Sequence, residues 1–151
     1  MSTPKHEPIL LIEKVFLLKS LNIFQETPEN VLADLAPLLQ DIEIEKGTEV
    51  FKEGDLGDSM YIIYQGEIRI HKGTTTLAIL KEKEVFGELS LLDAETRSAS
   101  AMAYTDCYLF KIDQEPFFEL IDSRPEIVNG FIKMLCKRLR ILNEKFDKQM
   151  M

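Results

Sequence analysis

The stretch FGELSLLDAETRSAS, residues Phe86 to Ser100, places one acid that looks buried, Glu88, and one arginine, Arg97, in a segment whose other residues are mostly apolar or small. Glu88 follows Gly87 directly, and Arg97 comes nine positions later. A glycine before ELSLL can open a short helical turn, and the first N–H groups of such a turn have no helical acceptor and attract an anion. Arg97 can bring a planar fork of donors to the same place. The stretch therefore predicts a site for a phosphate.

The acid in this stretch suggests what accompanies the phosphate. Glu88 cannot bind a phosphate, because like charges repel, but it can accept hydrogen bonds from the hydroxyls of a ribose. Ser90 and Ser98 can add neutral hydroxyl donors. One acid for sugar hydroxyls and one arginine for a phosphate describe a nucleotide that is recognised through its sugar-phosphate part. The alternative is that Glu88 and Arg97 form a structural ion pair that holds the loop together without a ligand.

Composition excludes several other classes of protein. The chain has 151 residues, 45% of them hydrophobic, and a net charge of −8, which argues against a free-standing nucleic-acid binder. Cys107 and Cys136 fall in apolar patterns and are expected to be buried free thiols. No signal peptide or membrane span is visible, so we expect a cytoplasmic protein. The loop EGDLGD lacks EF-hand spacing, and Gly54 and Gly57 are interpreted as turn residues, so no metal site is expected.

The order of elements is helix, strands, helix. Residues 9–20 and TPENVLADLAPLL favour helices, the second with Thr27 as its N-cap and Pro28 at its first position. Short alternating runs broken at Lys46-Gly47, Gln65-Gly66 and Lys72-Gly73 predict antiparallel strands in a sandwich or barrel. Asp113 is expected to cap the helix QEPFFELI. The chain is interpreted as one domain with an N-terminal helical segment, a barrel and C-terminal helices, at 1–40, 41–113 and 114–151.

The last predicted helix, which Pro125 opens, is longer than a small barrel needs to cover itself. Its apolar positions are spaced three and four residues apart: Val128, Phe131, Leu135, Leu139, Leu142 and Phe146. This stripe is either a dimer seam or a face that packs on the chain's own barrel. The same helix is basic, which suits its C-terminal half and a solvated face.

The stretch FGELSLLDAETRSASAMA resembles the phosphate-binding cassette of cyclic nucleotide-binding domains. That pattern is an aliphatic or aromatic residue, Gly-Glu, any residue, a small residue and an aliphatic one, then after a spacer Arg, a small residue and Ala. The chain meets it with Phe86, Gly87, Glu88, Ser90, Leu91, Arg97, Ser98 and Ala99. A second family pattern, Gly-Asp-x-small, a hydrophobic strand and Gly, is met by GDLGDSMYIIYQG, Gly54 to Gly66. The resemblance covers residues 20–146.

The resemblance implies a mainly β fold with flanking helices: an eight-stranded antiparallel jelly-roll, N-terminal helices and a long C-terminal helix. It implies that Glu88 binds the ribose 2′-hydroxyl, that Arg97 pairs with the cyclic phosphate, and that backbone amides of Gly87, Glu88, Ser98 and Ala99 complete the cradle. The implied site comprises Gly87, Glu88, Leu89, Ser90, Arg97, Ser98 and Ala99. The ligand is cAMP or cGMP, with no further cofactor.

The family's last helix closes over the base and often carries a dimer seam. The resemblance thus implies that ligand binding is coupled to movement of the C-terminal helix, with a homodimer through that helix and a fused or separate effector. Arg138, Leu142 and Asn143 are candidates for contact with the base, although Leu142 stands where bacterial activators of the family offer a hydroxyl to adenine. Ser98, in place of a threonine that tends to favour guanine, favours cAMP.

Three functional hypotheses follow. The first is a regulatory module that senses cAMP or cGMP. The second is a domain with this fold but without nucleotide affinity, used for protein interaction or dimerisation. The third, an enzyme, is disfavoured because the sequence holds no Ser-His-Asp set, no HExxH and no P-loop. The helix-turn-helix domain of the family's transcription factors does not appear before Met151, so we expect no nucleic-acid binding by this chain alone.

Overall fold

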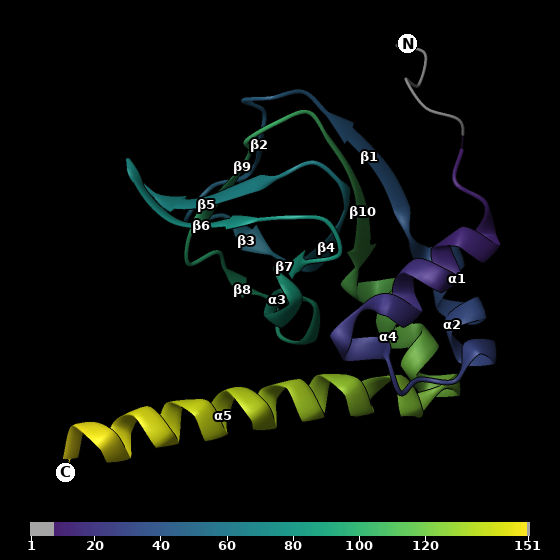
Figure 1. Cartoon of the computed structure of the whole chain (residues 1–151). Coiled ribbons are helices and arrows are strands. Elements are labelled where there is room, and N and C mark those ends of the chain that lie inside the picture. Colours follow the sequence, from purple (N-terminus) through teal and green to yellow (C-terminus); the bar gives the residue numbers. More distant parts are fainter. Residues whose placement is uncertain (1–7, 151) are drawn as a thin grey trace.

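A computed structural model describes residues 8–150 and shows β-sheets with helices at both ends of the chain (Figure 1). The predicted helix at 9–20 is confirmed, as is the helix that follows Pro28. The N-terminal elements are α1 Leu11–Ser20, the short 3-10 helix η1 Asn22–Phe24, α2 Glu29–Leu35 and the 3-10 helix η2 Ala36–Leu38. No helix within residues 8–150 is long and apolar enough to cross a membrane.

Ten strands follow in the described chain, and all their pairings are antiparallel. They are β1 Gln40–Ile44, β2 Glu49–Phe51, β3 Leu56–Gly57, β4 Ser59–Gln65, β5 Ile68–Lys72, β6 Thr75–Leu80, β7 Val85–Phe86, β8 Glu95–Thr96, β9 Ser100–Ala103 and β10 Cys107–Asp113. Eight of them form two four-stranded sheets, in the orders β1-β10-β4-β7 and β2-β9-β5-β6, and β3 pairs with β8 in a separate small ribbon. The expected eight-stranded fold is confirmed, and the β3–β8 ribbon is added to it.

Apolar side chains on both faces of β4 explain why two hydrophobic cores meet at this strand. Successive residues of a strand point to opposite sides of the sheet. Tyr61 and Ile63 enter the core that lies between the two sheets, whereas Met60 and Ile62 pack against the helices. The core on the side of the helices, which contains Met60 and Ile62, continues through the N-terminal helices to α4 Gln114–Ser123. The neighbouring strand β10 likewise contributes side chains to both cores, so this pair of strands joins the helices to the sheets.

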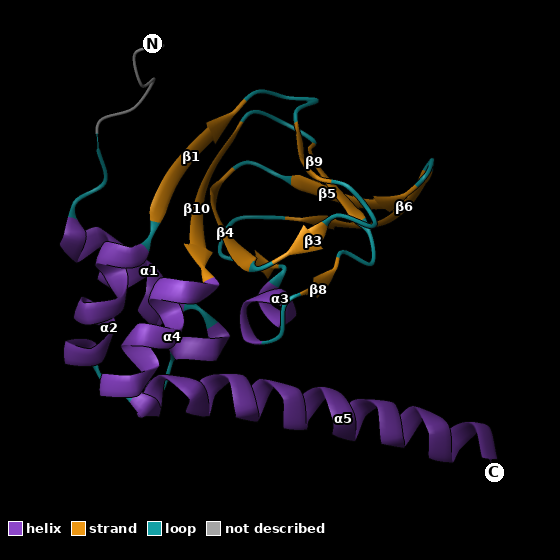
Figure 2. Cartoon of the chain, turned by 180° about the vertical axis from the view of Figure 1, so that it is seen from behind, coloured by secondary structure: helices purple, strands orange, loops and turns teal. Residues whose placement is uncertain are grey.

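The last helix, α5 Val128–Met150, follows the 3-10 helix η3 Pro125–Ile127 and runs past the barrel on the side of α3 Glu88–Leu92 (Figures 1 and 2). Its N-terminal end is fixed by Phe131, which is fully buried. The Phe131 ring lies edge-on to Phe24, at 5.7 Å between centroids, and to Phe117, at 5.6 Å. A Cβ built on Gly130 would overlap the carbonyl oxygen of Ile23. Only a glycine lets α5 approach η1 this closely.

The apolar stripe of α5 is covered for only part of its length. Phe131 is buried and Leu135 is half-buried, but Leu139, Leu142 and Phe146 are each about 60% exposed, at 59%, 61% and 61%. One of the two interpretations of the sequence is that the stripe packs on the chain's own fold. This interpretation holds only for the first half of the stripe. The second half has no cover within the described chain.

The structure corrects two local predictions, on Thr27 and Cys136, and confirms Asp113 as an N-cap residue with a different use of its side chain. The N-cap of α2 is Pro28 and not Thr27, which is buried one residue before it. Asp113 is the N-cap residue of α4, but its side chain makes no capping bond, because its carboxylate accepts hydrogen bonds from Gln40 and Ser59 instead. Cys107 is buried as expected, whereas Cys136 is exposed on α5, since it lies away from the stripe that Phe131 begins.

We predict that Gly130→Ala destabilises the fold. In an ordinary helix this change stabilises by up to about 1 kcal/mol, but here the new methyl would meet the Ile23 carbonyl. We expect the free energy of unfolding, measured in urea, to fall by about 1–3 kcal/mol because the contact is overpacked. Asn129→Ala, at the exposed neighbouring position, is the control and should change stability little. A Gly130→Ala protein as stable as the wild type would contradict the close contact.

Candidate functional site

All seven residues of the predicted site line a single cavity. The cavity has a volume of about 610 Å³ and lies where β7, α3 and the β8–β9 loop meet. The residues that the sequence placed there are Gly87, Glu88, Leu89, Ser90, Arg97, Ser98 and Ala99. The predicted short helical turn is α3, and Gly87 precedes it with a left-handed backbone at φ +74°, a conformation that favours glycine. We call this cavity the cradle.

The guanidinium of Arg97 is buried in the wall of the cradle, with only 7% of the residue exposed. Two glycines make room for it: a Cβ on Gly57 would overlap Arg97 Nε, and one on Gly87 would lie 2.6 Å from Nη1. The guanidinium carbon lies 4.1 Å from the centroid of the Phe51 ring, in a cation–π contact. Gly57 lies in β3 and has no left-handed backbone, so its interpretation as a turn residue is wrong, whereas Gly54, with φ +90°, fits that role.

One nitrogen of this guanidinium has no partner. Arg97 Nη2 donates to the carbonyl oxygen of Ser59 at 3.0 Å. Nη1 is the one buried side-chain nitrogen or oxygen in residues 8–150 that has no hydrogen-bond partner. An unpaired buried donor costs about 1–3 kcal/mol, more when it is charged. Burial also lowers the pKa of Arg97, which shows that the surroundings disfavour an uncompensated cation. An anion beside Nη1 would remove both penalties.

Backbone hydrogen bonds from the GDLGD loop hold Arg97 in place. The N–H of Arg97 donates to the Asp55 carbonyl at 2.7 Å, and the N–H of Gly54 donates to the Arg97 carbonyl at 2.8 Å. Next to these bonds, the β3–β8 ribbon pairs Leu56 with Thr96. The GDLGD pattern and the stretch that contains Arg97 thus each supply one strand of the same ribbon. The carboxylates of this loop lie in no metal-binding cluster, and no group of three such ligands occurs among the described residues.

Glu88 is paired with the last helix and not with Arg97. The residue is 8% exposed, and its Oε1 accepts a hydrogen bond of 2.5 Å from Arg138 Nη2 on α5. Within the described chain Glu88 and Arg97 form no ion pair with each other, so the interpretation of these two residues as a structural pair is wrong. The acid at the mouth of the cradle is instead the point at which α5 is attached to it.

Of the three residues predicted to contact the base, only one reaches a residue of the cradle. Arg138 reaches Glu88, as described, but Leu142 and Asn143 are exposed and do not line the cavity. Leu135, one turn before Arg138, lines it instead, and so does Phe51. Sequence reasoning missed Leu135 as a site residue because its place in the apolar stripe accounted for it. Phe51 carried no signal, since β2 is only three residues long.

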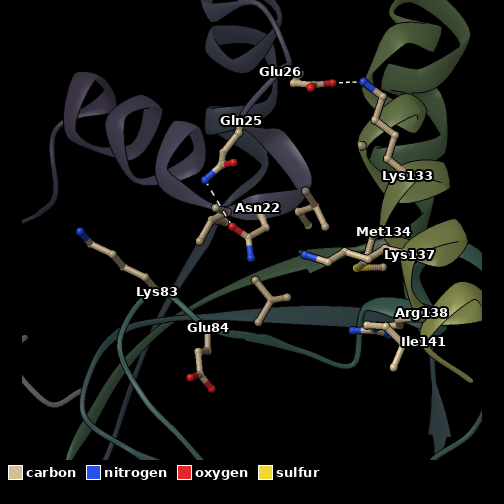
Figure 3. Close-up of a pocket in the computed structure, with 14 residues that line it drawn as sticks. Asn22, Gln25, Glu26, Lys83, Glu84, Lys133, Met134, Lys137, Arg138 and Ile141 are labelled. Carbon is tan, nitrogen blue, oxygen red and sulfur yellow. Dashed lines mark hydrogen bonds and ion pairs between the residues drawn. The ribbon is translucent and has the colours of Figure 1, made fainter. Parts of the chain in front are cut away.

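A second cavity of similar size lies beside the cradle. It has a volume of about 570 Å³ and runs between η1, the turn that joins β6 to β7, and α5 (Figure 3). We call it the η1–α5 groove. Arg138 belongs to the lining of the groove and also bonds to Glu88 of the cradle. Arg138 therefore links the groove to the cradle, and Val85 is a lining residue of both cavities.

Comparison with known proteins supplies independent information on this arrangement. The sequence model of the family described as "Cyclic nucleotide-binding domain" matches residues 41–124. The CRP-like cAMP-activated global transcriptional regulator of Mycobacterium tuberculosis is 33% identical over 132 residues, which are 84% of this chain and 59% of that protein. The human potassium/sodium hyperpolarization-activated cyclic nucleotide-gated channel 4 is 26% identical over 145 residues, 96% of this chain and 12% of the channel.

Solved structures agree with these sequence relatives. The crystal structure of the Thermus thermophilus catabolite activator protein superposes with a TM-score of 0.74 at 30% identity, covering 83% of this chain and 62% of that one. The matched region thus spans about three fifths of the bacterial regulators and a small part of the channel.

Proposed function

Because the chain belongs to the cyclic nucleotide-binding domain family, we propose that it is a regulatory module that binds a cyclic nucleotide in the cradle, with cAMP preferred. The observation that carries this proposal is the unpaired Nη1 of Arg97, a buried cationic donor in the wall of a cavity that all seven residues predicted to bind the sugar and phosphate line. A cyclic phosphate carries one negative charge, and its oxygens can accept the hydrogen bond that this donor does not make within the chain.

We assign the contacts as follows. Arg97 binds the cyclic phosphate, together with backbone amides of Gly87, Glu88, Ser98 and Ala99, and Glu88 accepts the ribose 2′-hydroxyl. Ser98 in place of threonine supports cAMP over cGMP. Contacts of the base with Leu142 and Asn143 require α5 to move toward the cradle, since both residues are now outside it. The proposed role is binding and signalling rather than catalysis.

The output is carried by α5. In the present structure Arg138 holds Glu88, the residue that we assign to the ribose. A nucleotide that bonds to Glu88 competes with Arg138 for the same carboxylate, so binding changes the attachment of α5. This is a differential contact of the kind that shifts a conformational equilibrium. An effector, fused to the module or separate, would read the position of the helix. We propose a cytoplasmic location, which suits the free thiols of Cys107 and Cys136.

The alternative is a domain that keeps this fold without nucleotide affinity. Such a domain would have no need for an arginine buried between two glycines with one nitrogen unpaired, because that arrangement lowers stability. The features of Arg97 therefore favour the nucleotide-binding role. Isothermal titration with cAMP and cGMP distinguishes the two roles, and absence of binding to both would favour the alternative.

We predict that Arg97→Ala weakens cAMP binding by about 2–5 kcal/mol, or about 30-fold to several-thousand-fold, because a charge-assisted contact in a partly dry cavity is lost. Arg97→Lys should recover only part of the affinity, since a point charge lacks the planar fork. Isothermal titration provides the measurement. Arg69→Ala, at a half-buried arginine on β5 that does not line the cradle, is the control and should bind as the wild type does. An Arg97→Ala protein with wild-type affinity would refute the assigned role.

A second prediction concerns the ribose. Glu88→Gln keeps the shape but replaces an ionised acceptor with a neutral one, so cAMP should bind more weakly by about 1–2 kcal/mol. The 2′-deoxy analogue of cAMP should bind the wild type more weakly than cAMP does, and Glu88→Gln should reduce this difference in affinity. The change also removes the ion pair with Arg138, which only the ribo ligand must displace, so the double-mutant cycle is run in an Arg138→Ala background, where that pair is absent and the coupling isolates the hydroxyl. Glu119→Gln, on α4, is the control. A coupling of zero would mean that Glu88 does not contact the 2′-hydroxyl.

A third prediction concerns assembly. We propose that a second copy of the chain covers the exposed half of the α5 stripe, because its apolar residues repeat at the three- and four-residue spacing of a helix–helix seam. Wild-type protein should sediment as a dimer at high micromolar concentration, and Leu139→Lys/Phe146→Lys should yield a folded monomer. Gln149→Lys adds a charge to the same helix and should leave the dimer intact. A monomeric wild type would exclude the seam.

A further inference from the structure

The η1–α5 groove combines an apolar floor with an excess of cations. Four of its lining residues are basic, Lys83, Lys133, Lys137 and Arg138, and two are acidic, Glu26 and Glu84. This balance is positive in a chain whose net charge is −8, so the groove is a local region of opposite sign. Such regions concentrate negatively charged ligands. The groove does not belong to the cradle, and the proposed nucleotide contacts make no use of its floor.

Two of the four cations already have partners and two do not. Lys133 pairs with Glu26, and Arg138 pairs with Glu88. Within the described chain no ion pair forms at Lys83 or Lys137. Figure 3 shows Lys137 extending its ammonium across the groove toward Asn22, while Glu84 turns its carboxylate away from the middle. The centre of the groove therefore holds a cation without a local counter-ion.

Asn22 adds a second donor at the same place. Its Oδ1 accepts a hydrogen bond of 3.3 Å from Gln25 Nε2, and Figure 3 shows its NH₂ group pointing into the same open part of the groove in which the Lys137 ammonium ends. An ammonium and an amide NH₂ group are both donors and cannot bond to each other. An oxygen of an anion placed between them would accept from both. The donors converge without an acceptor, which is the arrangement that an anion site requires.

We propose that the η1–α5 groove is a second ligand site, for an organic anion that carries a carboxylate, sulfonate or phosphate on an apolar body. The acidic group lies between Lys137 and Asn22, and the apolar body packs on Ile23, Val85 and Met134. A volume of about 570 Å³ lies within the ordinary range of small-molecule sites. The close contact between Gly130 and Ile23 fixes η1 and α5 against each other beside the groove, so the site is preformed.

The shared Arg138 connects this site to the cradle. An anion in the groove offers Arg138 an alternative partner and draws it away from Glu88. Glu88 is then free to accept the ribose hydroxyl, so the anion should strengthen the binding of cAMP. Linkage requires the converse as well, so that cAMP strengthens binding of the anion by the same factor. This coupling rests on the proposed function, whereas the existence of the groove site does not.

The groove site is tested on the full chain with two fluorescent probes. Anilinonaphthalene sulfonate has an apolar body and one anionic group, and N-phenyl-naphthylamine has the same body without the charge. We expect the sulfonate to bind more tightly than the uncharged probe. Lys137→Ala should weaken the sulfonate by about five- to tenfold, since a charge-assisted contact in a partly exposed site is lost. Lys145→Ala, exposed on the same helix outside the groove, is the matched control and should bind within about twofold of wild type.

The outcomes separate the groove from the proposed function. Equal affinities of Lys137→Ala and Lys145→Ala, or equal binding of the two probes, would overturn the groove site even if cAMP binds. For the coupling, cAMP is titrated with and without saturating sulfonate, and a gain of about threefold or more, absent in Arg138→Ala, is expected. An unchanged cAMP affinity would refute the coupling. Failure of cAMP to bind at all would refute the proposed function and leave the probe result standing.

Discussion

The burial of one guanidinium imposes most of the local structure around the cradle. Arg97 fits only because positions 57 and 87 lack side chains, and Phe51 supplies an aromatic face for its charge. The loop that leads into the β3–β8 ribbon holds both the N–H and the carbonyl of the arginine's backbone, through bonds to Asp55 and Gly54. A buried cation with an unpaired nitrogen is destabilising in isolation. The guanidinium of Arg97 lies in the wall of the cradle, where a bound anion could accept a hydrogen bond from the unpaired nitrogen.

The polar link between the cradle and the last helix is the ion pair of Glu88 with Arg138. Glu88 is almost fully buried, whereas the side chain of Arg138 is half-exposed, at 49%. Breaking the pair therefore affects the two partners unequally: the arginine can be solvated, but the carboxylate needs another donor. A ribose hydroxyl can supply that donor, and the arginine can turn toward the groove. The asymmetry gives each partner a different alternative, which is the basis of the communication that we propose between the two cavities.

Sequence reasoning succeeded where a residue type is required locally and failed where packing decides. The positions around Gly87 and Arg97 could be predicted because they form a local pattern: a glycine, which here takes a left-handed backbone, opens a short helical turn, and an arginine follows within the same stretch. The partner of Glu88 could not, because Arg138 lies fifty residues away and its meeting with Glu88 depends on the path of α5. Nor could the role of Gly57, whose missing side chain matters only once Arg97 is seen beside it. Two-residue strands such as β3 and β8 are too short for alternation to reveal.

The contact between Gly130 and Ile23 makes α5 a lever with its fulcrum at one end. Twenty residues separate Gly130 from Met150, so the free arm is about 30 Å long at 1.5 Å per residue. Arg138 sits less than halfway along this arm, at about 12 Å from the pivot. A tilt that moves Arg138 by about 2 Å would carry the end of the helix about 5 Å. A shift of Arg138 from one hydrogen-bond partner to another would thus produce a displacement more than twice as large at the C-terminal end of α5, where another protein could contact the helix.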